Sequence, residues 1–238
     1  MPVVKVKIWS DIACPWCFIG KRRFESALVS FEHRDEVQVH WRSYQLDPSL
    51  PEHFDGNETE YLSQMKGMPP AQVRQMFDHV MEQAAGEGLS YDFDSLVVAN
   101  SFTAHRFLHL AKQHGSMDQA KETLLSGHFE HGEDIGSTEY LVRVGTGLGM
   151  AADEIRTTLD SERFAADVRA DVDEARALGV TGVPFFVLDR KYGISGAQPV
   201  ETFTRALEQA WPESHPLVMA NDDGGSGDAA CGPDGCAV

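Results

Sequence analysis

The stretch that decides the fold is Cys14-Pro15-Trp16-Cys17. Alternating apolar and charged residues over Val4–Trp9 predict a strand before it, and a helical pattern begins at Phe18 after it. Pro15 suits the first helical position, because its missing N–H and its fixed φ cost nothing there. Cys14 is therefore expected at a helix N-terminus, where unpaired N–H groups and the helix dipole would stabilise its thiolate and lower its pKa.

Two thiols separated by two residues at a strand-to-helix junction suit disulfide exchange. Cys14 is expected to be the exposed, ionised sulfur that attacks a disulfide, and Cys17, one helical turn further on, the enclosed sulfur that resolves the product. A Cys-x-x-Cys pair is also half of a zinc site, and Cys231 and Cys236 could complete a four-thiolate cage. Redox chemistry is favoured, because a cysteine pair between a strand and a helix is typical of thioredoxin-like motifs. We therefore assign no metal ligand and no cofactor.

Composition and charge exclude several classes of partner. The chain has 238 residues, 42% of them hydrophobic, which is enough to build a substantial core. Its 37 acidic and 20 basic side chains give a net charge of −17, which disfavours binding to nucleic acid. The basic run Lys21-Arg22-Arg23 is predicted to be a solvated helix face. No stretch is long enough to span a membrane and no secretory signal is evident, so a cytoplasmic location is expected.

Strand patterns occur near both ends of the chain, with a long helical stretch between them. Val37–Tyr44 alternates like Val4–Trp9 and predicts a second strand, parallel to the first. The strand pattern returns over Gly179–Leu188 and, after a turn, over Tyr192–Gly196. Helical periodicity predicts helices at about 69–86, 95–115, 117–130, 137–144, 152–159 and 161–178, and a closing helix at 200–211.

This order predicts an α/β protein with a thioredoxin-like fold, in which a central mixed sheet is interrupted by a large all-helical insertion. The thioredoxin-like domain is expected to comprise residues 1–47 and 179–215, and the helical insertion residues 48–178. Residues 216–238 are acidic and rich in glycine and lack apolar periodicity, so they are expected to form a flexible tail that carries the second cysteine pair.

Several separated motifs resemble one known family. They are Asp11–Cys17, Gly20–Phe24, Gly179–Pro184 and Ser195–Gln198, in that order along the chain. Together they resemble the DsbA family, and within it the cytoplasmic FrnE-like branch, over about residues 3–211. The resemblance implies a thiol-disulfide oxidoreductase or isomerase that acts on protein thiols and disulfides. Its recycling partner would be a cellular thiol reductant or oxidant of the thioredoxin or glutathione type.

The resemblance also implies roles for individual residues. Cys14 would be the attacking sulfur and Cys17 the resolving one. The Val183–Pro184 bond would be cis and lie against the cysteines, leaving the Val183 backbone free to pair with an extended substrate chain. Trp16 stands where periplasmic DsbA proteins have a histidine, and without a cation beside the thiolate a less oxidising couple is expected. Trp16, Val183 and Pro184 are the predicted substrate-binding residues.

The second cysteine pair, Cys231 and Cys236, is interpreted as an auxiliary redox pair. A disulfide between them would close a loop inside one flexible segment, so it would add almost nothing to the stability of the fold. The linker before them spans roughly 15–20 Å on average and could bring them to the Cys14 site, where they would relay redox equivalents. A tail without function is the alternative.

Two other classes of function stay open. Glutathione-dependent isomerases and kappa-type glutathione transferases belong to the same superfamily, but they carry a serine or a single thiol where this chain has two cysteines. A zinc-binding module without redox activity is the second alternative. Outside the cysteine motifs, His105, His109, His128 and His131 are predicted to be ordinary helix residues, and Asp11 a capping or turn residue.

Overall fold

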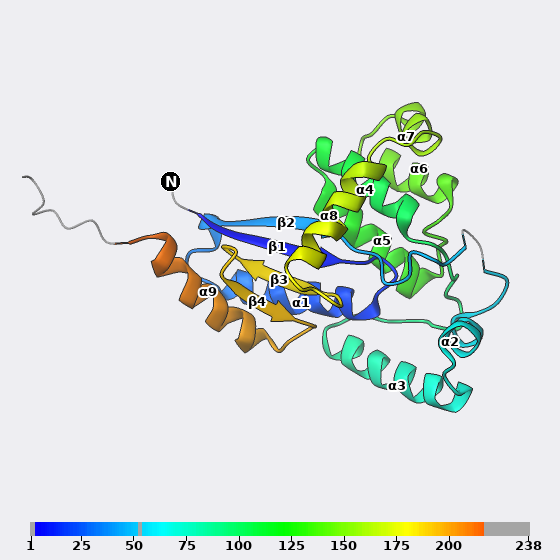
Figure 1. The fold of residues 1–238 in the computed structure, drawn as a ribbon, viewed down its shortest axis with the longest axis horizontal. Helices are drawn as coiled ribbons and strands as arrows, with labels where there is room; N and C mark the ends of the chain where they lie inside the picture. The colour runs from blue at the N-terminus through cyan, green and yellow to red at the C-terminus, as the bar shows by residue number, and fades with distance from the viewer. Residues whose placement is uncertain (1–2, 52–53, 217–238) are drawn as a thin grey trace, which may run out of the picture.

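The computed structural model describes residues 3–51 and 54–216, which form an α/β fold on one four-stranded sheet (Figure 1). The strands are β1 (Val4–Ser10), β2 (Val37–Ser43), β3 (Phe185–Leu188) and β4 (Tyr192–Ser195), in the spatial order β2-β1-β3-β4. As predicted, β1 and β2 are parallel, whereas β3 is antiparallel to both β1 and β4. The expected mixed sheet is confirmed.

Helices flank the sheet and fill the interval between β2 and β3. They are α1 (Pro15–Ser30), the 3₁₀ helix η1 (Arg34–Glu36), α2 (Glu58–Lys66), α3 (Pro70–Gly86), α4 (Phe102–Gln113), α5 (Met117–His131), α6 (Thr138–Gly147), α7 (Ala152–Leu159), α8 (Ala165–Ala177) and α9 (Val200–Ser214). Figure 1 shows α2 to α7 gathered at one end of the sheet. None of the helices in the described ranges is long and apolar enough to cross a bilayer.

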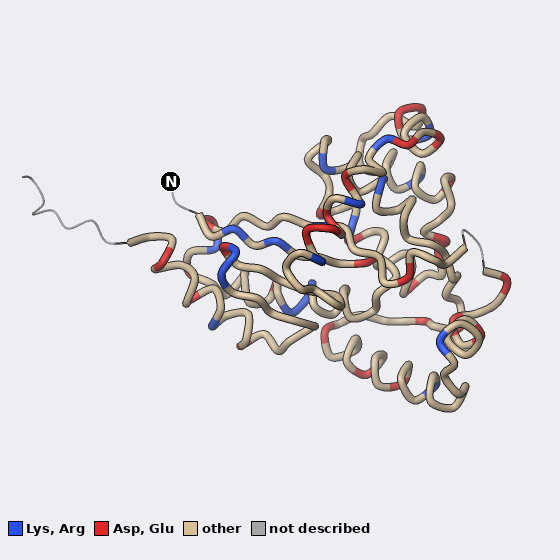
Figure 2. The backbone as a smooth tube through the Cα atoms, viewed as in Figure 1, with Lys and Arg blue, Asp and Glu red and all other residues tan. Residues whose placement is uncertain are grey.

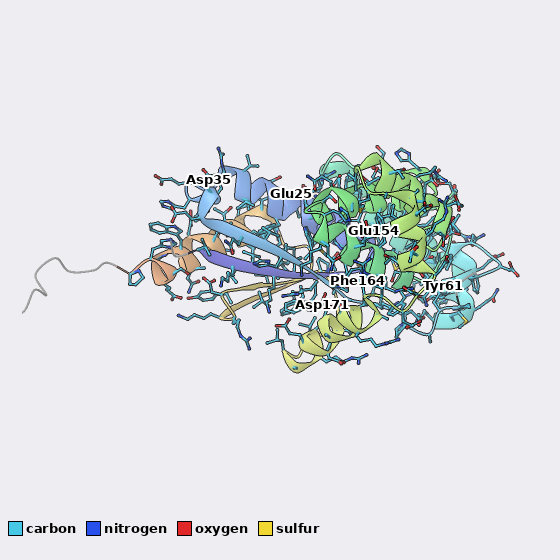
Figure 3. All side chains as sticks on the ribbon, turned by 90° about the horizontal axis from the view of Figure 1, so that it is seen from above. Glu25, Asp35, Tyr61, Glu154, Phe164 and Asp171 are labelled. Atoms are coloured by element: carbon cyan, nitrogen blue, oxygen red, sulfur yellow. The ribbon has the colours of Figure 1, made fainter. Side chains whose placement is uncertain are left out.

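The sheet lies between two layers of helices. On one face, Phe24 of α1, Phe186 of β3 and Phe203 of α9 pack together, with ring centroids 4.6–5.8 Å apart. On the other face, the indole Nε1 of Trp9 donates a 2.8 Å hydrogen bond to the backbone carbonyl of Asp171 in α8. Figure 3 shows α1 and α8 on opposite sides of the strands.

Helix α1 belongs to two hydrophobic cores at once. Its first turns bury Phe18 and Ile19 in the core of the helical segments, whereas its later turns bury Phe24 and Ala27 in the core against the sheet. The N-terminus of α1, which carries the two cysteines, is therefore located at the junction between the sheet and the helical insertion.

Residues 95–101 are not helical, although the sequence predicted a helix from Ser95. The Asp92 carboxylate accepts hydrogen bonds from the backbone N–H groups of Asp94 and Ser95, at 3.1 and 3.3 Å. The Asn100 side chain accepts another from the Phe102 N–H at 2.9 Å. Such bonds from side chain to backbone compete with the helical pattern, so α4 begins only at Phe102.

Helix α2 was not predicted, although its ends carry clear signals. Asn57 and Glu60 form a reciprocal capping box at its N-terminus, and Gly67 ends it in the left-handed conformation (φ 67°). The helix is short and buries only one side chain deeply, Tyr61, so its apolar periodicity is weak.

Helix α8 begins at Ala165, four residues later than predicted. The Arg106 guanidinium donates to the backbone carbonyls of Ser161 and, at 3.0 Å, of Arg163. These contacts hold the segment before α8 as a loop, and Phe164 precedes the helix with a positive φ of 65°.

The basic run of α1 is not a solvated helix face, which corrects the sequence prediction. Lys21 is buried, with Nζ 2.8 Å from Glu122 of α5, and Arg22 pairs with the same carboxylate. Arg23 Nε lies 2.6 Å from Glu87. The run faces α5 and the end of α3 and ties α1 to the helical insertion.

Acidic residues are spread along α3, α7 and α9 (Figure 2).

Candidate active site

The two cysteines lie where β1 leads into α1, as predicted. Cys14 is the N-cap residue with an extended backbone (φ −104°, ψ 111°), and Pro15 is the first helical residue. Both cysteines are free thiols. Cys14 is only 3% exposed and Cys17 1%, so the expectation of an exposed Cys14 is wrong. The helical insertion covers this helix end, and the Tyr91 hydroxyl donates a 2.7 Å hydrogen bond to the Pro15 carbonyl.

The loop before β3 lies against Cys14. The Val183–Pro184 bond is cis, which confirms the expectation drawn from the resemblance. The Cys14 thiol donates a hydrogen bond to the Val183 carbonyl, with 3.5 Å between Sγ and O, so this carbonyl is occupied and not free. The strand predicted from Gly179 begins only at Phe185, because the preceding residues form this loop.

The pKa of Cys14 is raised well above its ordinary range, whereas the sequence predicted a lowered pKa. The hydrogen bond with Cys17 is the largest cause, followed by burial and by the charges of Cys17 and Asp11. The Cys17 N–H at the start of the helix lowers the pKa of Cys14, but these causes outweigh it. Burial and neighbouring acidic groups dominate over the helix terminus at this site.

Asp11 is a buried carboxylate that organises the segment before Cys14. It accepts hydrogen bonds from the N–H groups of Leu46 at 2.7 Å and Ala13 at 3.3 Å, and His105 Nε2 lies 3.2 Å away. Burial alone would raise the pKa of Asp11, but its hydrogen bonds and the charge of His105 outweigh burial and lower it. Asp11 thus has the predicted turn contact, and it also links α4 and the chain after β2 to the site.

Helix α5 adds two buried basic residues, Lys121 and His128. They are seven residues apart and so lie on the same face of the helix. Burial lowers the pKa of Lys121 to about 8 and that of His128 to about 4. Lys121 Nζ lies 5.1 Å from the centroid of the Trp41 ring. Sequence reasoning missed Lys121, although two basic residues at this spacing among apolar neighbours were a signal.

His109 joins three elements away from the cysteines. Its Nε2 lies 3.2 Å from a carboxylate oxygen of Asp171 in α8 and 3.3 Å from the Ser43 hydroxyl in β2. This position makes His109 a structural link between α4, α8 and the sheet. His131, at the end of α5, is exposed and is an ordinary helix residue, as predicted.

A cavity of about 400 Å³ opens beside Cys14, between the N-terminus of α1 and helices α2 and α3. Its walls are largely apolar and include Trp16, Leu50, Tyr61, Met76, Phe77 and Phe93. Asp11 and Asp47 also line it, and the pKa of each is lowered, so both carry negative charge at neutral pH. The one lysine in the lining, Lys66, has its Nζ 2.6 Å from Asp47 and is neutralised by it.

The predicted substrate-binding residues are brought together around Cys14. Trp16 is half-buried, lines the cavity and has its ring 5.9 Å from that of His79. Val183 lines the same cavity, and Pro184 is buried behind it.

Two further sequence predictions concern metal ligands and the tail. Within residues 3–51 and 54–216, no group of three or more His, Cys, Asp or Glu side chains could hold a metal ion. Cys231 and Cys236 lie outside the described residues, so the structure does not test their predicted role.

Gly20 permits the close approach of α1 to the Val183–Pro184 loop, and we expect Gly20→Ala to destabilise the protein. A Cβ at this position would lie 2.8 Å from Cγ of the rigid Pro184 ring. The overpacking cost of about 1–3 kcal/mol exceeds the gain of about 1 kcal/mol in helix propensity, so the Tm should fall. Exchange activity should fall as well, because the loop that contacts Cys14 must shift.

The matched control is Gly86→Ala, in the last position of α3, where a Cβ would meet nothing within 4 Å. This variant should keep or raise the Tm and keep full activity. Thermal unfolding and disulfide exchange by both variants check the prediction, and a larger effect at position 86 than at position 20 would contradict it.

Comparisons with known proteins agree with this architecture. Residues 5–208 match the model of the DsbA-like thioredoxin domain. A probable DsbA oxidoreductase from Streptomyces coelicolor has a similar structure, with a TM-score of 0.85, 45% identity and coverage of 99% of each chain. The cytosolic disulfide reductase DsbM from Pseudomonas aeruginosa, solved with GSH, has a TM-score of 0.61 at 17% identity and covers 86% of this chain and 98% of its own.

A protein from Bacillus subtilis, the uncharacterized YwbO, is 23% identical over 210 residues, which are 86% of this chain and 96% of YwbO. The family model covers most of the chain, and the Streptomyces coelicolor protein is similar over its whole length. The chain therefore belongs to the DsbA-like thioredoxin family and is a disulfide oxidoreductase of that family.

Proposed function

We propose that this protein reduces or isomerises disulfides in protein substrates through Cys14 and Cys17. The observation that carries the proposal is the placement of the two thiols at the N-terminus of α1, with Cys14 Sγ against the Val183 carbonyl and beside the cavity. Cys14 loses its proton and attacks one sulfur of the substrate disulfide, and the other substrate sulfur leaves as a thiolate. Cys17 then attacks Cys14, which releases the second substrate thiolate and leaves a Cys14–Cys17 disulfide.

The raised pKa of Cys14 favours reduction and isomerisation over strong oxidation. A strongly oxidising couple such as DsbA owes its potential to a stabilised thiolate in the reduced form. Here burial, Cys17 and Asp11 oppose that thiolate, and the aromatic side chain of Trp16 supplies no positive charge. We therefore expect a couple less oxidising than DsbA.

The cavity beside Cys14 fits a substrate with an apolar side chain near its cysteine. Its aromatic and methionine lining would bury such a side chain at about 25 cal/mol per Å² of apolar surface. The second candidate partner, glutathione, carries two carboxylates. The ionised Asp11 in the lining opposes them, whereas the charge of Asp47 is balanced by Lys66. The observation that favours glutathione is that DsbM, which has a similar fold, was solved with GSH. Saturable binding of glutathione, together with activity that survives the loss of Cys17, would favour a glutathione-dependent enzyme.

Two finer points complete the proposal. Cys231 and Cys236 relay redox equivalents between a cellular thiol partner and the Cys14–Cys17 pair. The protein acts in the cytoplasm, where a reducing pool would return Cys14 and Cys17 to thiols after each turnover. The absence of a membrane-spanning helix among the described residues is consistent with this setting.

The reduction potential of the Cys14–Cys17 pair tests the proposed direction, and the tail variant tests the relay. Equilibration with redox buffers, followed by alkylation, should give a potential below about −180 mV, and a value of about −120 mV would contradict the proposal.

Reduction of insulin disulfides should slow in the double variant Cys231→Ser/Cys236→Ser while the potential of the active-site pair stays unchanged. Equal turnover by both proteins with every reductant would remove the relay alone.

A further inference from the structure

Glu58, the first residue of α2, lines the same cavity as Cys14. Tyr61 and Leu62 line it as well. Because residues three and four positions apart share one face of a helix, this face of α2 forms one wall of the cavity. The Glu58 side chain therefore belongs to the wall against which a substrate bound at Cys14 would lie.

Contacts near both ends of α2 hold this wall in place. The capping box at the N-terminus of α2 fixes the turn that contains Glu58. Further along, the hydroxyl of Tyr61 and the amine of Lys66 each donate a 2.6 Å hydrogen bond to Asp47, in the segment after β2. These contacts set the position of Glu58 beside the cavity without using its own carboxylate.

The Glu58 carboxylate is half-buried, and within residues 3–51 and 54–216 no hydrogen bond or ion pair is made to it. Lys66, the lysine of the lining, is bound to Asp47 instead. Burial raises the pKa of Glu58 to about 7, and no positive charge or hydrogen bond offsets this effect. A carboxylate withdrawn from water in this way is stabilised by any cation that reaches it.

The other charged groups of the lining add no unbalanced positive charge to the described part of the cavity. Asp11 is ionised, and the charges of Asp47 and Lys66 balance each other. His128 is 2% exposed, and burial lowers its pKa to about 4, so its ring is neutral at neutral pH. Its Nδ1 has no hydrogen-bond partner among the described residues, so the hydrogen bonding of this polar group is also incomplete. An incoming cation meets negative charge from Asp11 and Glu58.

The rest of the wall is largely apolar, which suits the stem of a long basic side chain. Its aromatic residues include Trp16 and Phe77. Lysine and arginine pack their methylene groups on such a surface while the charged end stays with a polar partner. Aromatic rings also attract cations, and the Tyr61 ring already has the amine of Lys66 at 5.8 Å from its centroid. The volume of about 400 Å³ is within the usual range for ligand sites.

We propose that Glu58 binds a lysine or arginine side chain of the substrate, close in space to the substrate cysteine that Cys14 attacks. The inference rests on the proposed exchange reaction and adds the class of side chain that the cavity selects. The stem of the basic residue packs on the aromatic wall, and its ammonium or guanidinium donates hydrogen bonds to the Glu58 carboxylate. Substrates that bring a carboxylate to the same place are disfavoured.

Short peptides that differ in one residue beside a single cysteine test this selection. The cysteine of each peptide forms a disulfide with 4-thiopyridine, and attack by Cys14 of the reduced protein on the peptide sulfur releases thiopyridone, which is followed by its absorbance. Lysine is compared with norleucine, which has a similar stem without the amine, and with glutamate, at each of the two positions on either side of the cysteine. Each rate is divided by the rate of the same peptide with dithiothreitol, which removes differences in intrinsic reactivity.

The expected result is a preference for lysine that depends on Glu58. At pH 8, where Glu58 is mostly ionised, the lysine peptide should react with the wild-type protein about tenfold faster than the norleucine peptide at the favoured position. Glu58→Gln should abolish this preference, because the amide keeps the size and removes the charge. Glu58→Lys should reverse it, so that the glutamate peptide becomes the fastest. Equal rates for lysine and norleucine at every position, or a preference that survives in Glu58→Gln, would overturn the proposal.

The matched control is Glu82→Gln, which neutralises an exposed glutamate of α3 outside the cavity lining and should keep the preference. Its loss in this variant would point to the overall charge of the protein and would also overturn the proposal. The norleucine peptide tests the exchange reaction separately, because no release of thiopyridone by the wild-type protein would refute the proposed function, whereas fast release without preference removes only the role of Glu58. Thermal unfolding checks that each variant is folded, and where one is not, the wild-type series still decides.

Discussion

Cys17→Ser is expected to trap the protein as a stable mixed disulfide with its substrate, and Cys14→Ser is expected to form no adduct at all. In the first variant Cys14 still attacks, but the serine hydroxyl cannot break the bond that forms. In the second the attacking sulfur is missing. Turnover in both should fall by more than about 10³-fold, as is usual when a nucleophile is removed.

Mass spectrometry of each variant after reaction with a disulfide-bonded peptide checks these outcomes, and the two variants serve as controls for each other. Because both thiols are buried and differ little in exposure, the roles rest on the contact of Cys14 with the Val183 carbonyl and with the cavity. A stable adduct on Cys17 in the Cys14→Ser variant would mean that the roles of the two cysteines are reversed.

Breaking the buried contact between Asp11 and His105 should have the largest effect on stability. In His105→Leu, the Asp11 carboxylate stays buried but loses its histidine partner, and removal of one partner of a buried pair costs about 3–5 kcal/mol. Asp11→Asn removes the charge and keeps the shape, so it should cost less. Urea unfolding at neutral pH measures both, and the surface variant Asp35→Asn, with its side chain 97% exposed, is the control.

The same pair gives stability a defined dependence on pH. The pKa of Asp11 is lowered from 3.8 in the folded state, so the unfolded chain takes up this proton at a higher pH than the folded one. The stabilisation from Asp11 is therefore fully present above the unfolded value and is lost as the pH falls through the folded value. Asp11→Asn should lack this loss, and an equal acid sensitivity in the variant would contradict the argument.

Asp11→Asn should also make Cys14 more reactive, which separates the electrostatic role of Asp11 from its structural one. The charge of Asp11 raises the pKa of Cys14, so its removal should lower that pKa and speed alkylation of the reduced protein at neutral pH. Alkylation that is unchanged would show that the other causes, the contact with Cys17 and burial, control the ionisation of Cys14.

The sequence by itself determined the local elements and their order. Val4–Trp9 and Val37–Tyr44 alternate between apolar and polar residues, and the helix begins at Pro15 as predicted, because these patterns depend on neighbours along the chain. Where local side-chain contacts compete, as at Asp92 and Asn100, periodicity placed a helix too early.

Only the tertiary structure decided the electrostatics of the site. A helix N-terminus predicts an acidic thiol, but the burial of Cys14 and the charges of Asp11 and Cys17 reverse that effect. The buried basic residues of the site, His105 and Lys121, come from helices far along the chain, so no spacing near the cysteine motif could reveal them. Local pattern specifies secondary structure because it acts over a few residues, whereas pKa depends on every charge and dipole that the fold brings within a few ångströms.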